Sequence, residues 1–453
     1  MLLCFISSTS FSQQITGRWG GDLNLPQGVT LPLVIHIEAA GDSLKATMDS
    51  PAQGATGIPV DKTSFDNNEL NFSVKALQLN YKGKLTGDSI TGSFTQMGHV
   101  LPLVLKKQNG NDLQLNRPQT PRPPFHYNIQ DVSVTNTEEG NTLAGTLTIP
   151  NEKDFPVVVM ITGSGAQDRD ETLFGHKPFW VIADYFANNG IGTLRLDDRG
   201  VGGSSKGKAG ATSADFATDI NSAVNYLHNK GYKNIGLVGH SEGGMIAPMV
   251  AINNKNVKFM ISMAGPSLPI DSLMVLQNMA ILKAGGASAE LIEATRRQAR
   301  SLYAYINNYN GINFETDLKS IILTQMQTNG ADTSNQQVKD AALNQVAQFK
   351  APWFRYFLKY NPANNISKLK IPVLAINGEK DVQVSAKENI AAWQQLLTKG
   401  ENKNFETMEL PNLNHLFQET KSGSIAEYGT LEQTFSPAVL KIMKDWILQN
   451  AKR

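Results

Sequence analysis

Cysteine is almost absent from this chain of 453 residues, because Cys4 is the only one. A single cysteine excludes an intramolecular disulfide. Its place near the start also excludes a Cys-ligated zinc site or a catalytic thiol in the body of the chain. Long apolar runs are missing after the first residues, so no transmembrane helix is expected.

Excess charge of either sign is also lacking. The chain has 41 Lys and Arg against 40 Asp and Glu, a formal net charge of +1. Binding to nucleic acid or to an anionic membrane depends on a summed positive field, so neither partner is expected. Hydrophobic residues make up 41% and charged residues 18% of the chain, which favours a large folded core over disorder.

Residues 1–14 look like the remnant of a secretory leader. An apolar start, MLLCFI, is followed by small polar residues, with Ser10-Phe11-Ser12 as a small-x-small cleavage site. The positively charged start of such a leader is missing, so the leader is expected to be truncated. Export to the periplasm or the exterior is expected, and a cytoplasmic protein with an apolar start is the alternative.

Residues 15–107 are expected to form an antiparallel β domain. Apolar residues alternate with others over 31–37, which is typical of a strand with one buried face. Turn signals such as Gly41-Asp42 and Gly87-Asp88 recur at roughly ten-residue spacing, a pattern that predicts a barrel or sandwich. Residues 108–126 contain four prolines within a short span and predict a stiff linker.

The remaining residues alternate between predicted strands and helices. The predicted strands are 143–149, 157–161, 192–196, 235–238, 259–263, 371–376 and 405–410. This alternation favours a mostly parallel sheet with helices on both faces, formed by 127–266 and 366–453. Residues 267–365 have helical periodicity and no strand pattern, so they are interpreted as an inserted helical cap.

Residues 239–243 read GHSEG and match the pattern G-x-S-x-G. The pattern alone is weak, because residues 203–207, GSSKG, match it as well. Context separates the two: a predicted strand precedes Ser241 and a predicted helix follows it, whereas no strand leads into Ser205. A sharp turn between strand and helix lifts the hydroxyl above the sheet, which favours Ser241 as a nucleophile over a structural turn serine.

A serine hydroxyl needs a base to remove its proton, and His415 is the candidate. Enzymes with such a strand–turn–helix nucleophile carry serine, acid and histidine in that order along the chain. Among the seven histidines, only His415 follows Ser241. It stands just after the predicted strand 405–410, and a surface-loop histidine is the alternative interpretation.

The acid is expected after the preceding strand, in the turn where Glu379 and Asp381 both lie. The Gly-x-x-Asp turn favours Asp381, which would orient the imidazole and stabilise its charged form. Glu379 is interpreted as a solvated loop charge.

Backbone N–H groups are expected to stabilise the oxyanion of the intermediate. One is the N–H of Glu242, directly after the nucleophile. The other is expected from the loop 162–167, where glycines let the backbone approach a ligand closely. Ser164 is the predicted donor, with Gly165 and Ala166 as one-residue alternatives.

Two charged motifs also follow predicted strands. Residues 168–171, DRDE, are interpreted as a local ion-pair network, with an anchor for the oxyanion loop or a substrate contact as the alternative. Residues 197–203, DDRGVGG, form a second glycine-rich turn. No G-x-x-x-x-G-K-[ST] pattern is present, so this turn is interpreted as structural rather than phosphate-binding.

Together these motifs resemble the α/β-hydrolase superfamily, specifically a bacterial carboxylesterase branch. The resemblance spans about residues 125–453 and rests on four segments: 163–165 (GSG) with 167–170 (QDRD), 198–202 (DRGVG), 239–244 (GHSEGG) and the cap segment 352–357 (PWFRYF). One departure is Thr162, where many relatives carry histidine; it concerns the geometry of the oxyanion loop. Residues 15–107 resemble β-rich domains fused to such hydrolases.

The resemblance implies an α/β-hydrolase fold with an inserted helical cap, behind an N-terminal all-β domain of barrel or sandwich type. It implies a serine hydrolase that cleaves carboxylic esters with short or medium acyl chains, without metal or cofactor. The cap is expected to supply the pocket for a small-molecule ester. Its aromatic candidates, which helical spacing also explains as packing, are Tyr303, Tyr305, Trp353, Phe354 and Phe357.

Two other functions share some of these features. A serine peptidase of the prolyl-oligopeptidase kind has the same catalytic layout, but its β-propeller needs roughly 300 residues, more than precede the linker here. A glycan- or lipid-binding protein with a vestigial hydrolase is the second alternative, and the complete Ser, Asp and His set argues against it. The natural ester and the oligomeric state do not follow from these patterns.

Overall fold

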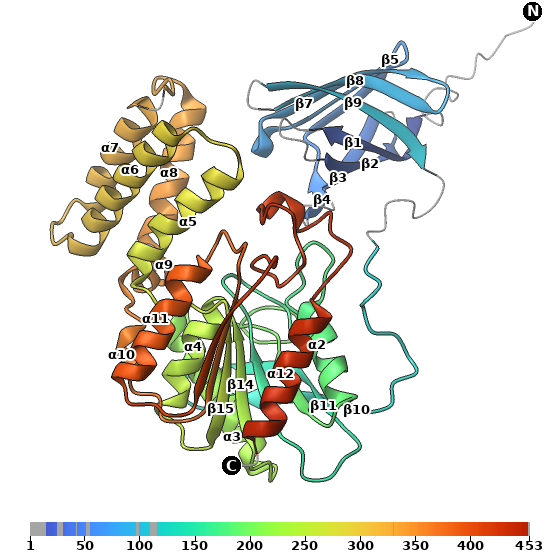
Figure 1. Cartoon of the computed structure of the whole chain (residues 1–453). Coiled ribbons are helices and arrows are strands. Elements are labelled where there is room, and N and C mark those ends of the chain that lie inside the picture. The colour runs from blue at the N-terminus through green and yellow to red at the C-terminus, as the bar shows by residue number, and fades with distance from the viewer. Residues whose placement is uncertain are drawn as a thin grey trace, which may run out of the picture. The chain divides into compact units, whose positions relative to one another are not determined.

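The computed structural model of the chain describes residues 15–24, 30–41, 43–50, 55–96, 99–108, 116–328 and 330–451. The predicted leader remnant and residues 109–115 of the predicted linker lie outside the described residues. The described chain divides into two compact units (Figure 1). One comprises residues up to 118 together with 173–176 and 426–432, and the other comprises the rest. The finer predicted bounds, such as 267–365 for the cap, stay predictions.

The described residues of the N-terminal unit form a nine-stranded sheet in the order β4-β3-β2-β1-β9-β8-β7-β6-β5. All pairings are antiparallel. β3 also approaches β5, so the sheet curls toward a barrel. Its strands are β1 (Gly17–Asn24), β2 (Thr30–Ala40), β3 (Ser43–Ser50), β4 (Ala55–Pro59), β5 (Lys62–Asp66), β6 (Glu69–Val74), β7 (Leu79–Thr86), β8 (Ser89–Gln96) and β9 (His99–Gln108).

Alternating residues of these strands build a core of their own. Leu33, Ile35 and Ile37 of β2 are buried, as the period of two predicts. Trp19 and Tyr81 are the largest side chains buried among them. The hydroxyl of Tyr81 has two backbone carbonyls within hydrogen-bond distance, so its one hydrogen has an acceptor despite burial. The prediction of an N-terminal all-β domain is confirmed.

The second unit contains, among its described residues, an eight-stranded sheet in the order β10-β11-β13-β12-β14-β15-β16-β17. The pairs β10–β11 and β11–β13 are antiparallel and the others are parallel. The strands are β10 (Asn128–Thr135), β11 (Thr142–Ile149), β12 (Val157–Ile161), β13 (Gly192–Leu196), β14 (Ile235–His240), β15 (Val257–Met263), β16 (Val373–Gly378) and β17 (Phe405–Leu410). The predicted mostly parallel sheet is confirmed.

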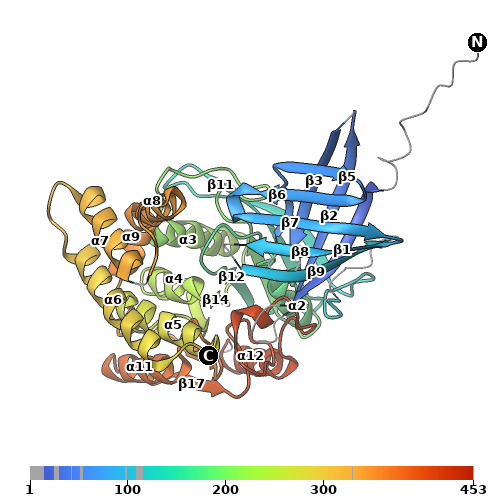
Figure 2. The ribbon, with the colours of Figure 1, turned by 90° about the horizontal axis from the view of Figure 1, so that it is seen from above.

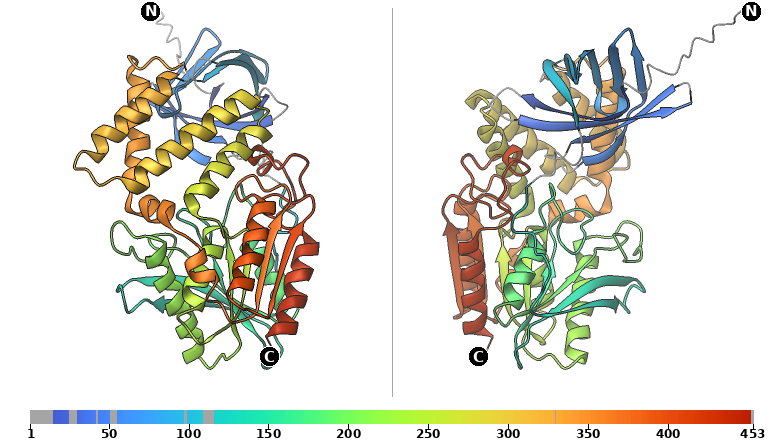
Figure 3. Two further views of the ribbon diagram at one scale, coloured as in Figure 1. Left: turned by 60° about the vertical axis from the view of Figure 1, so that its left-hand side comes forward. Right: turned by 90° about the vertical axis from the view of Figure 1, so that its right-hand side faces the viewer.

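Helices cover both faces of this sheet (Figure 3), which is why β12 near its centre is apolar throughout. In β12, Val157 and Val159 pack in one core with α3, α4 and α11. Val158 and Met160 pack in the opposite core with α2 and α12. The helices are α2 (Pro178–Ala187), α3 (Ser213–Asn229), α4 (Glu242–Ala251), α11 (Ala386–Lys399) and α12 (Pro437–Asn450).

A group of helices lies between β15 and β16 in the chain (Figure 2). They are α5 (Ile270–Ala284), α6 (Ala289–Asn308), α7 (Phe314–Thr328), α8 (Gln336–Lys350), α9 (Pro352–Lys359) and α10 (Ala363–Ile366). Most pack around a separate apolar core that includes Leu302, Ile306 and Leu318. None of the helices within the described ranges has the length and apolar character that crossing a membrane requires.

Candidate active site

The carboxyl ends of the parallel strands meet at one edge of the sheet. Ile161 at the end of β12 pairs with Gly239 of β14, and Gly378 at the end of β16 pairs with Leu410 of β17. The loops that follow these strands therefore emerge side by side. Such an edge is where open α/β sheets bind ligands, and all the sequence-predicted catalytic residues lie on these loops.

Ser241 stands in the bend between β14 and α4. Its backbone has φ 52 and ψ −119, in the left-handed half of the map that side chains rarely adopt. The residue is half-buried although its neighbours on both sides are buried. This is the strained strand–turn–helix geometry that the sequence pattern predicts.

Two glycines make the bend possible because neighbouring backbone leaves no room for a side chain. A Cβ at Gly239 would stand 2.2 Å from the carbonyl oxygen of Gly243. A Cβ at Gly243 would stand 2.1 Å from the carbonyl oxygen of Ile161. The other G-x-S-x-G match has no such setting, since Ser205 is exposed and bonds the backbone of Thr142.

Asp381 and His415 are brought together by the loops after β16 and β17. His415 Nδ1 lies 2.7 Å from Asp381 Oδ2, and both residues are buried. The backbone N–H groups of Gln383 and Val384 donate to the other carboxylate oxygen. The amide of Asn377 donates to Oδ2 at 3.0 Å, so the carboxylate is held from several directions.

The alternative acid, Glu379, has a different environment. It is exposed, and its Oε2 accepts the backbone N–H of Asn412 at 2.9 Å. Of the two carboxylates in this turn, the structure brings only Asp381 to the imidazole of His415. The ring of His415 also lies against the ring of His240, with centroids 4.8 Å apart. His415 therefore lies against the residue that precedes Ser241.

Two carboxyl groups accept hydrogen bonds from the predicted oxyanion loop, 162–167. Glu171 Oε1 accepts the N–H of Gly163 at 2.7 Å. Asp198 accepts the hydroxyl of Thr162 and the N–H of Gln167, each at 2.9 Å. Because the N–H groups of 163 and 167 are committed to these carboxylates, the predicted donors 164–166 lie between two anchored points.

The loop also lies directly beside the bend. A Cβ at Gly163 would stand 3.2 Å from Cβ of Ser241. Ser164, the predicted donor, is exposed, and its carbonyl accepts the side chain of Gln167. The following Gly165 has φ 104, a conformation that favours glycine.

Glu242 begins α4, so its backbone N–H belongs to the first turn, where amides have no partner within the helix. Its side chain is buried and points elsewhere. Oε1 accepts the hydroxyl of Ser213 at 2.6 Å and the indole N–H of Trp353 at 2.9 Å. Glu242 thus connects the bend to α3 and to α9 of the inserted helices.

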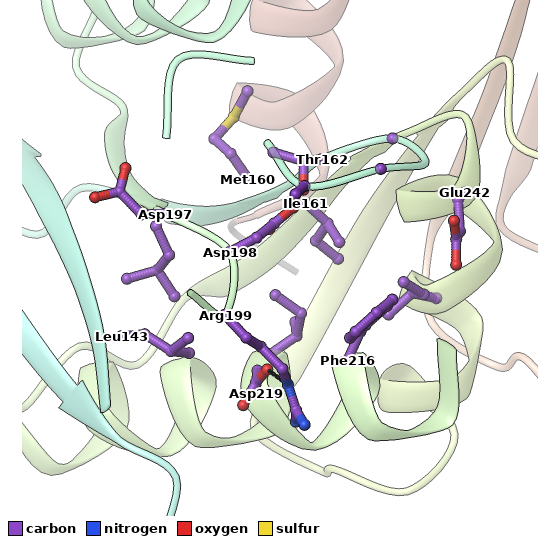
Figure 4. A pocket seen from close by; sticks show the side chains of 16 residues that line it. Leu143, Met160, Ile161, Thr162, Asp197, Asp198, Arg199, Phe216, Asp219 and Glu242 are labelled. Carbon is purple, nitrogen blue, oxygen red and sulfur yellow. Dashed lines mark hydrogen bonds and ion pairs between the residues drawn. The ribbon is translucent and has the colours of Figure 1, made fainter. Parts of the chain in front are cut away.

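A cavity of about 150 Å³ lies beside the oxyanion loop (Figure 4). Gly163 and Gly165 of this loop and Glu242, the residue after Ser241, form part of its wall. The rest is mainly apolar and includes Leu143, Met160, Leu196, Phe216, Ile220 and Ile246. An apolar wall of this kind accommodates a hydrocarbon chain better than a charged group.

Asp198 lines the same cavity as a buried carboxyl group. Burial raises the pKa of Asp198 to about 7, and it outweighs the hydrogen bonds from Gln167 and Thr162, which lower the pKa. The nearby carboxylates of Glu171 and Glu242 raise the pKa further. The protonation of this group therefore changes near neutral pH.

The five predicted pocket aromatics are not on the wall of this cavity. Tyr303 and Phe354 are buried in the core of the inserted helices, where helical spacing turns them toward their neighbours. Tyr305 packs at the edge of that core, and Phe357 joins an apolar cluster with Met245. Trp353 alone among the five bonds a residue of the bend, through Glu242.

The sequence left two interpretations of the motif 168–171, an ion-pair network and an anchor for the oxyanion loop. Its residues do both. Arg169 pairs with Asp197, and Asp170 pairs with Arg195, which is the expected ion-pair network. Glu171, by contrast, anchors the oxyanion loop through Gly163 and also bonds His240 Nδ1 at 3.0 Å. Sequence reasoning missed His240, because the chain order of serine, acid and histidine points only to histidines that follow Ser241.

No group of three or more His, Cys, Asp or Glu residues in the described ranges is arranged to hold a metal ion.

A family model described as alpha/beta hydrolase fold matches residues 156–422, which is more than half of the chain. The chain belongs to the alpha/beta hydrolase fold family. The predicted resemblance is confirmed, and the match includes both the bend at Ser241 and the loop of His415.

Among curated proteins, this hydrolase-fold chain is similar to esterase EstD of Thermotoga maritima, at 26% identity over 300 residues. The match covers 65% of this chain and 61% of EstD, so it spans about three fifths of that relative's length.

Two solved structures align with this chain at low similarity. An esterase of Pyrococcus furiosus, Pf2001, is 15% identical, with a TM-score of 0.44, over 76% of this chain and 99% of that one. A proline iminopeptidase of Mycobacterium smegmatis is 12% identical, with a TM-score of 0.43, over 71% and 99%. Identities this low concern the fold alone.

Proposed function

We propose that this protein is a serine carboxylesterase in which Ser241 is the nucleophile, His415 the general base and Asp381 the residue that orients His415. The observation that carries the proposal is the 2.7 Å hydrogen bond between buried Asp381 and His415, on loops at the same sheet edge as the strained Ser241. Similarity to EstD, an esterase by name, supports ester hydrolysis as the reaction.

Before the proposed acylation step, neutral His415 carries its hydrogen on Nδ1, which donates a hydrogen bond to Asp381. Nε2 is then unprotonated and can accept a proton. Nε2 takes the proton of the Ser241 hydroxyl as its oxygen attacks the ester carbonyl carbon. The carbonyl oxygen becomes an oxyanion, which the N–H groups of Glu242 and Ser164 stabilise. The tetrahedral intermediate collapses when protonated His415 gives its proton to the leaving alcohol, and the acyl group stays on Ser241.

Deacylation repeats these steps with water. His415 removes a proton from water as the water oxygen attacks the acyl carbon, and the second intermediate releases the carboxylic acid. The proton returns to the oxygen of Ser241, so the enzyme ends as it began. Asp381 keeps its negative charge throughout and stabilises the imidazolium form of His415.

The acyl chain is proposed to be short or medium in length. A cavity of about 150 Å³ lies beside the oxyanion loop, and a cavity of roughly that volume holds one benzene molecule. We therefore expect p-nitrophenyl esters of about two to six acyl carbons to give the highest kcat/KM. A rate that keeps rising to about twelve carbons would contradict this assignment.

Labelling with a fluorophosphonate probe tests the nucleophile. The wild-type protein should label at Ser241 and hydrolyse p-nitrophenyl acetate, and Ser241→Ala should abolish both while the fold is kept. Ser205→Ala is the matched control, because it removes the serine of the other G-x-S-x-G match and should leave both unchanged. A folded wild-type protein that never labels would instead favour the binding function with a vestigial hydrolase.

The same assay separates esters from peptides. We expect turnover of p-nitrophenyl acetate to exceed that of a dipeptidyl anilide by several orders of magnitude. Strong amidase activity without esterase activity would point to a peptidase. Export is a further proposal, which fractionation of cells that make this protein would test; protein found only in the cytoplasm would contradict it.

A further inference from the structure

A second histidine–carboxylate pair lies beneath the proposed site. His240 is the last residue of β14, and its Nδ1 lies 3.0 Å from Glu171 Oε1. Both side chains are 7% exposed, so little water reaches the pair. Neither residue takes part in the proton transfers described above. Buried ionisable groups are costly unless they are paired, which calls for a reason for their presence here.

The hydrogen-bond partners determine where the protons of His240 lie. Nε2 faces the backbone carbonyl oxygen of His415 at 2.9 Å, which can only accept, so Nε2 carries a hydrogen. Nδ1 faces Glu171 Oε1, an oxygen that already accepts the N–H of Gly163 at 2.7 Å. With both ring nitrogens facing oxygens, the imidazolium form of His240 lets each ring N–H donate a hydrogen bond.

The electrostatics agree with this assignment. Burial lowers the pKa of His240, but the charge and hydrogen bond of Glu171 outweigh burial, and the carbonyl of His415 and the charge of Asp381 add to them. The pKa of His240 is therefore raised above its ordinary value. The other faces of the ring meet the rings of His415 and Phe417.

The pair connects three segments that are far apart in sequence. Glu171 holds the N–H of Gly163, in the loop after β12. His240 is covalently joined to Ser241 and bonds the carbonyl of His415, in the loop after β17. Glu171 has φ 52, like Ser241. Strained residues of this kind persist where the surroundings hold them in place, commonly at functional sites.

We propose that the ion pair of Glu171 and His240 is a positioning device, which holds the oxyanion loop, the nucleophile bend and the loop of the general base in register with one another. The inference rests on the proposed esterase function for its catalytic consequence. Neither residue contacts the substrate; both act through Gly163, Ser241 and His415. The charge matters as well as the contacts, because in the charged form both hydrogen bonds to Glu171 Oε1 come from N–H donors to a carboxylate oxygen, and such charge-assisted bonds are the strong ones.

Glu171→Gln tests the role of the charge with little change of shape. The amide oxygen of glutamine can still accept the N–H of Gly163, but His240 loses the carboxylate that keeps it protonated. We expect kcat for p-nitrophenyl acetate to fall about 10- to 100-fold with KM changed by less than about 3-fold, because misplaced donors weaken transition-state stabilisation.

The pH profile gives a readout that a purely structural role would not move. The rings of His240 and His415 lie 4.8 Å apart between centroids, so a positive charge on His240 repels a second positive charge there. In Glu171→Gln this opposition is lost. The acid limb of kcat/KM against pH should therefore move to higher pH. An unchanged limb with an unchanged kcat in a folded variant would overturn the proposal.

Asp49→Asn is the matched control. Asp49 Oδ2 lies 2.6 Å from Nε2 of His36 in the N-terminal sheet, so the variant breaks another histidine–carboxylate pair, which belongs to the other unit. It should leave kcat, KM and the pH profile unchanged. An equal fall in kcat in both variants would assign the effect to general destabilisation and overturn the proposal.

Histidine imidazole ¹⁵N NMR of the full-length wild-type protein tests the ion pair even if Glu171→Gln fails to fold. One imidazole should keep both nitrogens protonated at pH 8. In the described residues, His36 and His415 also bond a carboxylate, so His36→Asn and His415→Asn identify their signals. If every remaining imidazole is neutral at pH 8, the ion pair does not exist and the proposal is overturned.

These outcomes are separable from those of the proposed function. A wild-type protein that never reacts with fluorophosphonate contradicts the esterase and, with it, any catalytic role of the pair. A protein that labels normally but lacks the doubly protonated imidazole contradicts the positioning device alone.

Discussion

The two units of this protein bury very different material. Among the described residues from 15 to 108, Ser50 is the one buried residue with a polar side chain of this kind, and the core is otherwise apolar. The hydrolase unit buries charged or titratable side chains in number, namely Glu171, Arg195, Asp197, Asp219, His240, Glu242, Asp381 and His415. Burial of such groups costs free energy unless each has partners.

The buried charges are also concentrated in place. Most of them lie at the carboxyl ends of β12, β13, β14, β16 and β17 or in the segments that follow these strands, whereas the sheet cores are apolar. The N-terminal sheet is thus stabilised mainly by apolar burial, and the hydrolase unit keeps a costly polar edge. Buried titratable groups gathered at one edge are typical of functional sites.

The largest expected effect on kcat comes from a substitution at the centre of the polar edge. Asp381→Asn removes the charge that stabilises the imidazolium of His415, so kcat for p-nitrophenyl acetate should fall about 10³- to 10⁴-fold. Glu379→Gln changes an exposed carboxylate in the same turn and serves as the control, with activity retained. The reverse ranking in steady-state assays would assign the acid to Glu379 and refute the choice made here.

The next effect belongs to the apolar unit. Trp19 is fully buried in the core of the N-terminal sheet, so Trp19→Ala should destabilise that unit by about 3–5 kcal/mol. Urea unfolding should show an earlier transition. Fluorophosphonate labelling per molecule should persist, because the cores of the hydrolase unit are built from other residues. Loss of labelling in step with that transition would contradict the separation of the two cores.

A smaller effect concerns the pH dependence of stability. Burial raises the pKa of Asp198 to about 7 from an ordinary 3.8. The native state therefore holds this proton more tightly than the unfolded state, and the resulting stability is present below about pH 4 and lost as pH rises toward 7. Asp198→Asn should flatten this loss by on the order of 2 kcal/mol. Parallel stability curves for the two proteins over this range would refute it.

The smallest expected effect tests the contact between the inserted helices and the bend. Trp353→Phe removes the indole N–H that donates to Glu242 but keeps an aromatic ring against Phe357. Since Ser213 still donates to the same oxygen, kcat/KM should fall only about 3- to 10-fold, as one lost hydrogen bond predicts. A larger fall would mean that the indole has a second task, such as contact with substrate.

Local pattern was enough to predict the bend at Ser241. The apolar strand, the flanking glycines and the following helix are contiguous in sequence, and the structure places them as expected. Asp381 and His415 were found from chain order after predicted strands, because parallel strands bring their carboxyl ends to one edge. Their catalytic roles stay predictions, as does the choice of Ser164 as an oxyanion donor.

Sequence patterns did not predict the contacts between segments that are far apart in the chain. Helical spacing could not separate packing from lining among the cap aromatics, and Tyr303 and Phe354 lie in the core. Nothing in sequence connects Glu171 to His240, which are 69 residues apart. Nor does it reveal that Asp198 is buried with few partners, the cause of its raised pKa.

The sequence by itself determined the class of fold and the order of the chemically important residues, since strand periodicity and short motifs depend on neighbours along the chain. Only the tertiary structure decided how Asp381 meets His415, which acid holds the predicted oxyanion loop and where a cavity remains beside that loop. The physical reason is that burial and electrostatic pairing depend on distances in space, which the packing of helices onto both faces of the sheet sets.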